Sequence, residues 1–420
     1  MRVALLKFSL LVAFSLSFNM AASASDYMRQ PNNPAETLVE LMGQRIVLMH
    51  PVAAWKWANN IPIEDKDREA IVLTNARQKA EAYGLDPDST EAFFKVQIKI
   101  AKQAQQQAFD QWERDGYPFE TPPDLNTHTR PKISALTEQI IAQLAIAVPH
   151  LDTAFGRYRG TMKRAWTQDL QAAFADIKYA DTPQAQALKA LLESGRLRVG
   201  TTGDYAPFSD QTAEGLEGID IDLARDLAMF LGLNLELVPT SWPTLLEDLA
   251  ADQYDIGMSG ISIKPFRLEA AHMSAAYHTG GKTPIIRCAD QDRFQSLEDI
   301  DQEDVDLVVN PGGTNERFVR ANIKQADIRV FNDNAMIFNE IVLDRADVMI
   351  TDAIEVTYRS AIHPDLCPAM AGETFTFSEK GYLMPQNALL RQQVNRWLAD
   401  RTERGVVQRT FNRHLSASGQ

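Results

Sequence analysis

Two patterns of hydrophobic and polar residues divide the chain. Up to about residue 176, apolar residues recur at the three- and four-residue spacing of amphipathic helices. These helical runs cover 35–58, 66–83, 88–114 and 131–175. After about residue 180, helical runs alternate with short apolar strands at 197–202, 255–259, 307–310 and 347–351. The order predicts an all-α domain followed by an α/β domain with mainly parallel strands.

The first helical run carries a cation where an apolar residue is expected. Its apolar stripe passes through Leu38, Leu41, Arg45, Leu48, Val52 and Trp55. A buried guanidinium is costly unless an anion meets it. Lys56 follows eleven residues after Arg45 and returns to nearly the same face, ~16 Å further along the helix. Two interpretations stay open: a small dianion bound between helices, or an Arg45 that pairs with a buried acid.

Other helical runs repeat this oddity. Gln105 occupies a core position in the stripe of Phe94, Ile98, Ala101, Gln105, Phe109 and Trp112, and a buried amide needs partners. Asp65 is a candidate N-cap for a helix that opens with Arg68 and Glu69, and Arg130 begins the fourth run. An Asp-x-x-Arg pair at a helix start is by itself usually capping and surface charge. Together these residues point cations and amides into one helical bundle, with no nucleophile–base pair among them.

In the α/β half, polar side chains follow the predicted strands. Ser262 and Arg267 follow 255–259, the loop with Asn310, Thr314 and Asn315 follows 307–310, and Asp352 and Glu355 follow 347–351. Ligands gather at the carboxyl ends of strands in open α/β sheets. Asp352 and Glu355 share a helix face, and like charges so close would raise one pKa and keep a proton donor ready. The alternative is an Asp352 N-cap and a solvated Glu355.

Composition narrows the function classes. The 420 residues are 45% hydrophobic and 23% charged, which is typical of two or three globular domains. The net charge of -14 argues against nucleic-acid partners and anionic membrane surfaces, but not against small anionic substrates. Two cysteines and seven histidines show no metal-ligand spacing. Cys288 and Cys367 would form one disulfide or stay free, and the sequence leaves this open.

The N-terminus predicts export. Arg2 and Lys7 precede an apolar run at 8–18, and a small-x-small cleavage site ends at Ala24. We expect a signal peptide over 1–24 and a periplasmic protein, with a retained membrane anchor as the alternative.

The motifs of the helical half resemble those of the helical chorismate mutases, in the secreted subclass, over about residues 35 to 175. They comprise Arg45, the segment 52–57, the segment 63–65, Arg68, Glu69, Phe93, Phe94, Gln97, Ile98 and Gln105. The resemblance implies substrate carboxylates on Arg45 and Arg130, and donation to the ether oxygen by Lys56 and Gln105. It implies that Asp65, Arg68 and Glu69 set the hydroxyl and carboxylate end. Ala101 departs from the pattern, because some relatives carry a hydroxyl residue there.

From about Leu191 onward the chain resembles the periplasmic amino-acid-binding proteins and, within them, the cyclohexadienyl dehydratases. The matching segments are 202–205, 240–243, 281–285, 310–317, 351–355 and 378–380. The resemblance implies carboxylate binding by Ser262 and Arg267, and Trp242 packed on the substrate ring. It implies a cleft lined by Lys282, Asn310, Thr314, Asn315 and Asp352. Glu355 would be the general acid.

These expectations combine into a multidomain protein. It has a signal peptide (1–24), an all-α chorismate mutase domain (25–178), a linker (179–190) and a two-lobed α/β domain of the type II periplasmic-binding-protein fold (191–420). The expected activity is bifunctional: chorismate is rearranged to prephenate, and prephenate or arogenate then loses water and carbon dioxide. The rearrangement needs no acid, base or covalent step, only a folded dianion and positive charge at the ether oxygen.

No cofactor, nucleic acid or membrane partner is expected, and a homo-oligomer is. One alternative is an amino-acid-type solute-binding protein with a helical adaptor. A cleft that only binds needs no proton donor, so Glu355 is the residue that distinguishes this alternative from an enzyme. Another is a mutase with an inactive C-terminal half.

Overall fold

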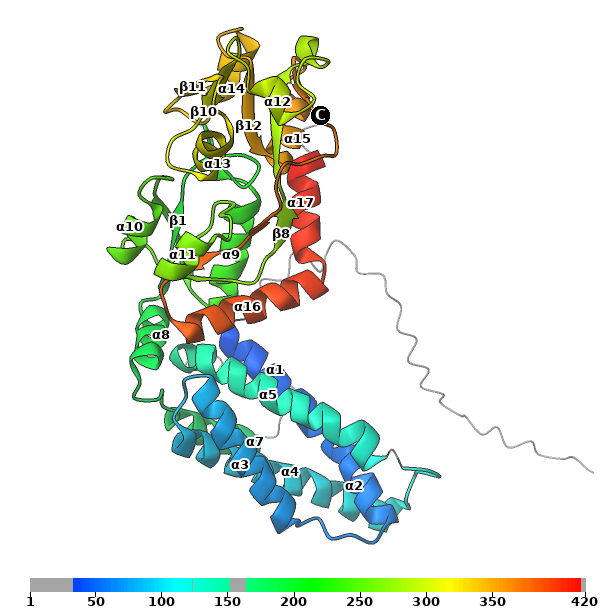
Figure 1. The fold of residues 1–420 in the computed structure, drawn as a ribbon. Helices are drawn as coiled ribbons and strands as arrows, with labels where there is room; N and C mark the ends of the chain where they lie inside the picture. Colours follow the sequence, from blue (N-terminus) through cyan, green and yellow to red (C-terminus); the bar gives the residue numbers. More distant parts are fainter. Residues whose placement is uncertain (1–32, 123, 152–163, 417–420) are drawn as a thin grey trace, which may run out of the picture.

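The computed structural model describes residues 33–122, 124–151 and 164–416. It is elongated, with an all-helical part at one end and two α/β lobes at the other (Figure 1). The helical part consists of α1 (Pro34–Val47), α2 (Met49–Ala58), α3 (Lys66–Ala82), α4 (Pro87–Asp115), η2 (Leu125–Thr129), α5 (Arg130–Ala147), η3 (Val148–His150) and α7 (Arg164–Ala175). The predicted order, a helical domain before an α/β domain, is confirmed.

Local signals explain where these helices begin and end. Asp65 caps α3 by accepting the Arg68 backbone N–H at 3.0 Å, as its position predicted. The predicted run 35–58 is interrupted at Leu48, which lies between α1 and α2. The predicted run 131–175 is wrong as a single helix, because α5 ends at Ala147 and a 3₁₀ turn with Pro149 follows.

The buried face of α1 and α2 is rotated from the predicted stripe. Its later members are Met42, Arg45, Met49, Val52 and Lys56, whereas the predicted Leu41, Leu48 and Trp55 are only half-buried. The two helices contact α5 and α4, so apolar residues occur on more than one side and blur the periodic signal. Arg45 remains on the buried face, and Lys56 lies on it as well.

The α/β part has two five-stranded sheets, one in each lobe, besides a three-stranded and a two-stranded sheet. In the first lobe the strand order is β5-β1-β6-β15-β7, and in the second it is β11-β10-β12-β9-β13. The strands are β1 (Arg196–Thr201), β2 (Asp204–Tyr205), β3 (Ser209–Thr212), β4 (Gly215–Glu217), β5 (Asn234–Pro239), β6 (Ile256–Gly257), β7 (His272–Met273), β8 (His278–Gly280), β9 (Lys282–Arg287), β10 (Asp306–Val309), β11 (Asp327–Val330), β12 (Val348–Asp352), β13 (Leu366–Pro368), β14 (Ser378–Lys380) and β15 (Leu383–Met384).

The strands that lead to the cleft are parallel. β1 pairs with β5 and β6, and β10 pairs with β11 and β12, all in parallel. The pairings of β9, β13 and β15 are antiparallel, so the sheets are mixed. A two-stranded ribbon of β8 and β14 connects the lobes. The helices of this part are α8 (Pro183–Glu193), α9 (Ile219–Leu231), α10 (Leu245–Ala250), α11 (Pro265–Ala270), η4 (Cys288–Asp290), α12 (Leu297–Ile300), α13 (Thr314–Asn322), α14 (Ile337–Val342), α15 (Ala353–Ile362), α16 (Ala388–Glu403) and α17 (Val406–Ser416).

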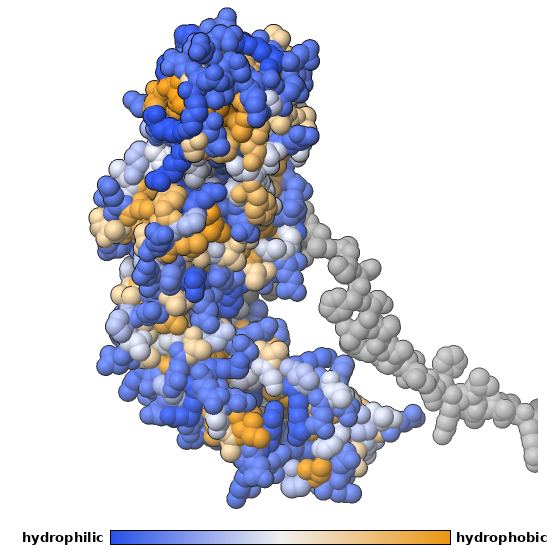
Figure 2. Space-filling view, viewed as in Figure 1, coloured by the Kyte–Doolittle hydropathy of each residue, from blue (hydrophilic) through white to orange (hydrophobic). Residues whose placement is uncertain are grey.

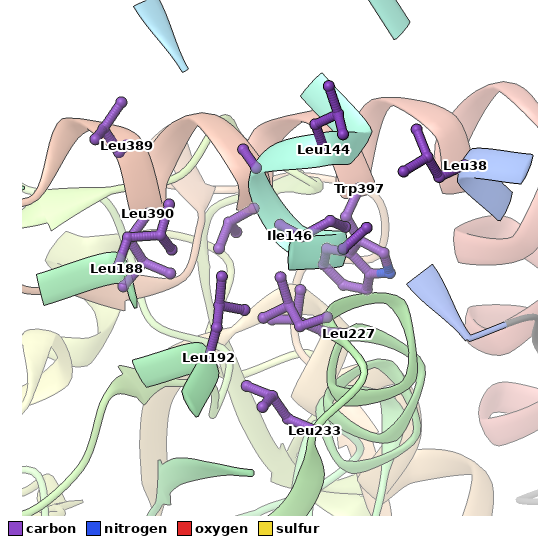
Figure 3. Packing of buried hydrophobic residues seen from close by; sticks show 14 of the residues in the cluster. Leu38, Leu144, Ile146, Leu188, Leu192, Leu227, Leu233, Leu389, Leu390 and Trp397 are labelled. Atoms are coloured by element: carbon purple, nitrogen blue, oxygen red, sulfur yellow. The ribbon is translucent and has the colours of Figure 1, made fainter. Parts of the chain in front are cut away.

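One apolar core runs from the helical part into the first lobe. Leu38 of α1 and Leu144 and Ile146 of α5 belong to the same buried cluster as Trp397 of α16 and Leu227 of α9 (Figure 3). Helix α8, which overlaps the segment 179–190, adds further leucines to this cluster. Burial of side chains of this size contributes ~1.5–3 kcal/mol each, so the helical part is docked rather than tethered.

A disulfide joins Cys288 and Cys367 in the second lobe. Cys288 opens η4 directly after β9, and Cys367 lies in β13, which pairs with β9. The bond therefore fastens the edge strand β13 to its neighbour. The sequence left open whether the two cysteines are bonded or free, and the pairing of these two strands brings them together.

Candidate active sites

The helical part contains a pocket of about 670 Å³, including its open mouth. All seven residues predicted for this half line it: Arg45, Lys56, Asp65, Arg68, Glu69, Gln105 and Arg130. The wall between them is apolar and comes mainly from Met49, Val52, Ile98, Leu125 and Ile133. Helices α1 to α4 and the start of α5 therefore converge on one cationic pocket of a size suited to a small molecule.

Arg45 is a buried cation without an acidic partner in the part of the chain that the structure describes. Its side chain is only 4% exposed, and its Nη1 donates to Gln97 Oε1 at 3.5 Å. Burial lowers the pKa of Arg45 to about 10. Its Nε has no hydrogen-bond partner among the described residues. Of the two interpretations of Arg45, this arrangement favours the one with an external anion.

Lys56 and Gln105 face the same pocket. Lys56 Nζ donates to the Ile63 carbonyl at 2.6 Å, which uses one of its three N–H groups. Burial lowers the pKa of Lys56, and the nearby carboxylates of Asp65 and Glu69 oppose that change. Gln105 Nε2 donates to the Ala101 carbonyl at 3.1 Å, one turn back on α4. The second N–H of Gln105 points to Met49 Sδ at 3.9 Å, a weak acceptor that a ligand oxygen can replace, and Lys56 keeps two further N–H groups for a ligand.

Lys102 is a pocket residue that sequence reasoning missed. It lines the pocket from α4, and its Nζ lies 3.2 Å from the Glu69 carboxylate. Helical spacing could have identified it, because Lys102 lies four residues after Ile98 and three before Gln105 and so shares a helix face with these two pocket residues. Arg130, at the start of α5, also lines the pocket, and its guanidinium donates to Asn126 Oδ1.

A second pocket, of about 320 Å³ including its mouth, lies between the two lobes. From the first lobe it is lined by Tyr205, Trp242, Gly260, Ser262 and Arg267, and from the second by Asn310, Gly313, Thr314, Asn315, Asn334 and Asp352. Seven predicted residues are among them. Two others, Lys282 and Glu355, lie behind the wall.

Asp352 is the electrostatic centre of this cleft. It accepts hydrogen bonds from the Tyr205 hydroxyl and, at 2.8 Å each, from Lys282 Nζ and Lys380 Nζ. Burial alone would raise the pKa of Asp352, but the two ammonium groups hold it well below its usual value. Asp352 occupies the N-cap position of α15, as the alternative predicted, but its side chain makes no capping bond and is bound to the two lysines and Tyr205 instead. Tyr205 and Asp352 come from different lobes, and their contact joins the two.

Lys282 supports the cleft wall. Its ammonium contacts Asp352, Thr314 Oγ1 at 3.0 Å, and Asn315 Oδ1. These contacts account for the three N–H groups of a lysine. The cation therefore holds three wall residues together instead of pointing into the pocket.

Glu355 is fully buried and lies next to the cleft wall rather than in it. Thr351 Oγ1 donates to Glu355 Oε2 at 2.6 Å, and Asn315 Nδ2 donates to Thr351 Oγ1 at 3.1 Å. This line of hydrogen bonds connects the carboxyl group to a pocket-lining amide. The other oxygen, Oε1, has no partner among the described residues. The alternative of a solvated Glu355 is wrong, because its side chain is 0% exposed.

The pKa of Glu355 is raised to about 7. Burial is the main cause, and the charge of Asp352 adds to it, while Arg359 and the bond from Thr351 act in the opposite direction. Repulsion by Asp352, which the sequence predicted as the cause, is therefore a minor contribution. Because Asp352 is itself paired with two lysines, desolvation of Glu355 is the larger effect.

Arg267 and Ser262 lie together on the first-lobe side. Arg267 is 3% exposed, its Nη1 donates to the Ser262 carbonyl at 2.7 Å, and its Nε has no partner among the described residues. Burial lowers the pKa of Arg267 to about 10. A buried guanidinium with a free N–H suits a carboxylate ligand.

The two lobes meet around the pocket. Asn334 Nδ2 donates to the Asp204 carbonyl at 2.9 Å, and Trp242 Nε1 donates to Asp204 Oδ1 at 3.0 Å. Tyr205, Thr351 and Lys380 fall within the segments 202–205, 351–355 and 378–380, so a signal for them existed. Asn334 lies outside every such segment, and no sequence pattern identified it.

Neither pocket contains a metal-binding arrangement in the described part of the chain, where no group of three or more His, Cys, Asp or Glu side chains could hold an ion. The helices described here include none with the length and apolar character needed to span a bilayer. The visible face of the helical part is mainly hydrophilic, with only small apolar patches (Figure 2).

Comparison with known proteins identifies both halves. Residues 197–417 match the bacterial extracellular solute-binding proteins of family 3, and residues 36–106 match chorismate mutase type II. Cyclohexadienyl dehydratase of Pseudomonas aeruginosa is 48% identical over 233 residues, which are 55% of this chain and 87% of that protein. Secreted chorismate mutase of Mycobacterium tuberculosis is 31% identical over 109 residues, which are 26% of this chain and 54% of that protein.

A solved structure supports the fold of the lobes. The crystal structure of an ancestral amino acid-binding protein, described as a precursor of cyclohexadienyl dehydratase, superposes with a TM-score of 0.52 at 33% identity. The match covers 55% of this chain and 99% of that one. The chain therefore belongs to the bacterial extracellular solute-binding proteins of family 3, is a homologue of cyclohexadienyl dehydratase, and carries a chorismate mutase type II domain ahead of that fold.

Proposed function

We propose that this protein is a bifunctional enzyme of phenylalanine biosynthesis. The helical pocket rearranges chorismate to prephenate, and the cleft between the lobes converts prephenate, or its amino analogue arogenate, to phenylpyruvate or phenylalanine. The observation that carries this proposal is the pairing of two sites in one chain. One is a cationic pocket without an acid–base pair, and the other is a cleft with a buried, protonatable carboxyl group.

In the helical pocket, catalysis rests on shape and charge. Arg45 and Arg130 hold the two carboxylates, and the apolar wall keeps the substrate in its folded conformation. As the bond to the ether oxygen breaks, negative charge develops there, and Lys56 and Gln105 donate to it. Asp65, Arg68 and Glu69 orient the hydroxyl and carboxylate end. No proton leaves the substrate.

In the cleft, the reaction needs one proton. Glu355 is its source, and because this carboxyl group lies behind the wall, the proton reaches the departing ring hydroxyl through the Thr351 hydroxyl or after a small movement of the wall. The hydroxyl leaves as water, while the ring carboxylate leaves as carbon dioxide and its electron pair completes the aromatic ring. Arg267 and Ser262 bind the side-chain carboxylate, and Trp242 packs on the ring. Asn310, Thr314 and Asn315 line the cleft, with Lys282 and Asp352 holding that wall. A pKa near 7 leaves Glu355 partly protonated at neutral pH.

The test uses the purified full chain with chorismate as the sole substrate. We expect loss of chorismate and formation of phenylpyruvate, with prephenate as the intermediate. Prephenate and arogenate supplied separately show which compound the cleft prefers. Chorismate loss without any phenylpyruvate, from chorismate or from added prephenate, would reduce the protein to a mutase.

The family of the lobes favours a second candidate, binding of an amino acid without turnover. Calorimetric titration with amino acids would detect it, and it requires that neither prephenate nor arogenate be converted.

The relatives of both halves include extracellular and secreted proteins, which supports export of this chain. The predicted signal peptide, 1–24, lies outside the described residues. Periplasmic location and assembly into a homo-oligomer belong to this proposal and are tested by cell fractionation and light scattering.

A further inference from the structure

Lys102 lies at the rim of the helical pocket, where it connects two helices. Its Nζ is 3.2 Å from the carboxylate of Glu69 and 3.7 Å from that of Glu64, so α4 and α3 are bridged at the pocket wall. The Lys102 side chain is 34% exposed, so its ammonium contacts these carboxylates while it remains partly in solvent.

The charges of the pocket give this contact its importance. Five cations line it, namely Arg45, Lys56, Arg68, Lys102 and Arg130, against the two carboxylates of Asp65 and Glu69. Asp65 already accepts a backbone N–H at the start of α3. Glu69 is the acid whose charge would meet a doubly anionic ligand directly, and the ammonium of Lys102 offsets that charge.

The neighbouring residue on α4 adds a second reason. Ala101 presents only a methyl group to the pocket, and it can neither donate nor accept a hydrogen bond. Gln105 Nε2 is bonded to the Ala101 carbonyl, within its own helix. The residue at position 101 therefore offers the substrate hydroxyl no partner, which leaves that contact to Glu69, and Glu69 is held by Lys102.

We propose that Lys102 is a positioning residue of the mutase site, which holds the Glu69 carboxylate toward the substrate hydroxyl and offsets its charge against the dianion. This inference rests on the proposed mutase activity. It assigns the specificity for a hydroxylated dianion to a pair of residues, Lys102 and Glu69, and not to Glu69 alone.

The experiment measures steady-state chorismate rearrangement by the Lys102→Met variant of the full chain. We expect KM to rise roughly fivefold with little change in kcat, because loss of an ion pair of this kind weakens substrate and transition state alike. Lys102→Arg should restore KM. The matched control is Lys99→Met, which removes a lysine on the same helix that pairs with Asp169 outside the pocket.

A double-mutant cycle with Glu69→Gln separates positioning from general electrostatics. In the Glu69→Gln background, Lys102→Met should have little further effect on KM, because the carboxylate that it holds is gone. Additive effects, or an unchanged KM in Lys102→Met, would overturn the inference. If the unaltered protein does not rearrange chorismate at all, the proposed function fails first, and this outcome is distinct. Melting temperatures near that of Lys99→Met show that the variants are folded.

Discussion

At Glu355 the carboxyl group has lost contact with solvent completely, and the loss of hydration favours its neutral form. With a pKa of about 7, the proton donor is present below pH 7 and is lost as the pH rises through that value. We expect kcat/KM of the dehydratase to fall about tenfold per pH unit above 7. Chorismate loss by the same protein is the internal control, because it needs no titrating acid. A dehydratase profile that is flat to pH 9 would contradict Glu355 as the donor.

The variant Glu355→Gln should abolish phenylpyruvate formation while prephenate accumulates from chorismate.

The same variant should also change stability in a pH-dependent way. Since the folded-state pKa lies above the unfolded value, ionisation costs the folded state increasingly as the pH rises from about 4.5 to about 7. The variant should therefore melt higher than the unaltered protein at pH 8 and close to it at pH 4. Undiminished phenylpyruvate production would remove Glu355 from the mechanism.

Lys56 carries the corresponding prediction for the helical pocket. Lys56→Ala removes a buried donor aimed at developing negative charge, and the rate of chorismate consumption should fall ~100- to 1000-fold. Added prephenate should still be converted at the normal rate, because the cleft is separate. Lys95→Ala on α4, which removes an exposed lysine paired with Glu91, serves as the control. Near-normal rearrangement by Lys56→Ala would mean that this residue is not at the reaction centre.

At the scale of elements, the helix pattern was enough to predict polar residues that line the first pocket, but not their buried neighbours. Arg45, Lys56 and Gln105 could be predicted because residues three, four or eleven apart on a helix share a face whatever the tertiary context. The identity of the buried neighbours could not be predicted. Met42 and Met49 are buried in the structure, whereas the sequence predicted that Leu41 and Leu48 would be. The reason is that α1 and α2 contact two other helices, and a prediction from one apolar stripe assumes a single contact face.

The disulfide makes a prediction for the second lobe. It closes a loop between residues 79 apart and fastens β13 to β9, so its loss should cost ~2–4 kcal/mol of stability. With reductant, dehydratase activity should be lost at a lower temperature than in its absence, while chorismate rearrangement is less affected. The double variant Cys288→Ser, Cys367→Ser should melt low with or without reductant. If reductant does not change the melting curve of the unaltered protein, the disulfide does not stabilise the second lobe.

At the scale of the whole molecule, the first lobe separates the two sites, because the helical part lies on one side of it and the cleft on the other (Figure 1). The helical part docks on the first lobe through the start of α1 and the end of α5, and α2 lies far from the lobes (Figures 1 and 3). Lys56 of α2 follows Leu38 of the docking core in α1 by 18 residues, which at helical rise corresponds to ~27 Å if the two successive helices are collinear. The cleft lies beyond the far end of β1, a further ~20 Å. We therefore expect an intermediate made in one site to pass through solvent before it reaches the other.

This separation predicts the result of mixing two single-site variants. Equal amounts of Lys56→Ala and Glu355→Gln should together produce phenylpyruvate from chorismate. At the same concentration of intact sites of each kind, the lag and the steady rate should equal those of the unaltered protein. Added unlabelled prephenate should dilute label passing from chorismate to product. A shorter lag in the unaltered protein, or resistance to dilution, would show direct transfer, for instance between subunits of an oligomer.

The sequence by itself determined the succession of an all-α and an α/β part, and it placed the polar groups of each site on particular helix faces and strand ends. Those features depend on local spacing, which a chain carries before it folds. Only the tertiary structure decided that Lys282 and Glu355 stand behind the cleft wall, that Lys380 and Tyr205 meet Asp352, and that the helical part is docked on one lobe. Such contacts join residues distant in sequence, and burial, which sets the pKa of Glu355, exists only when they form.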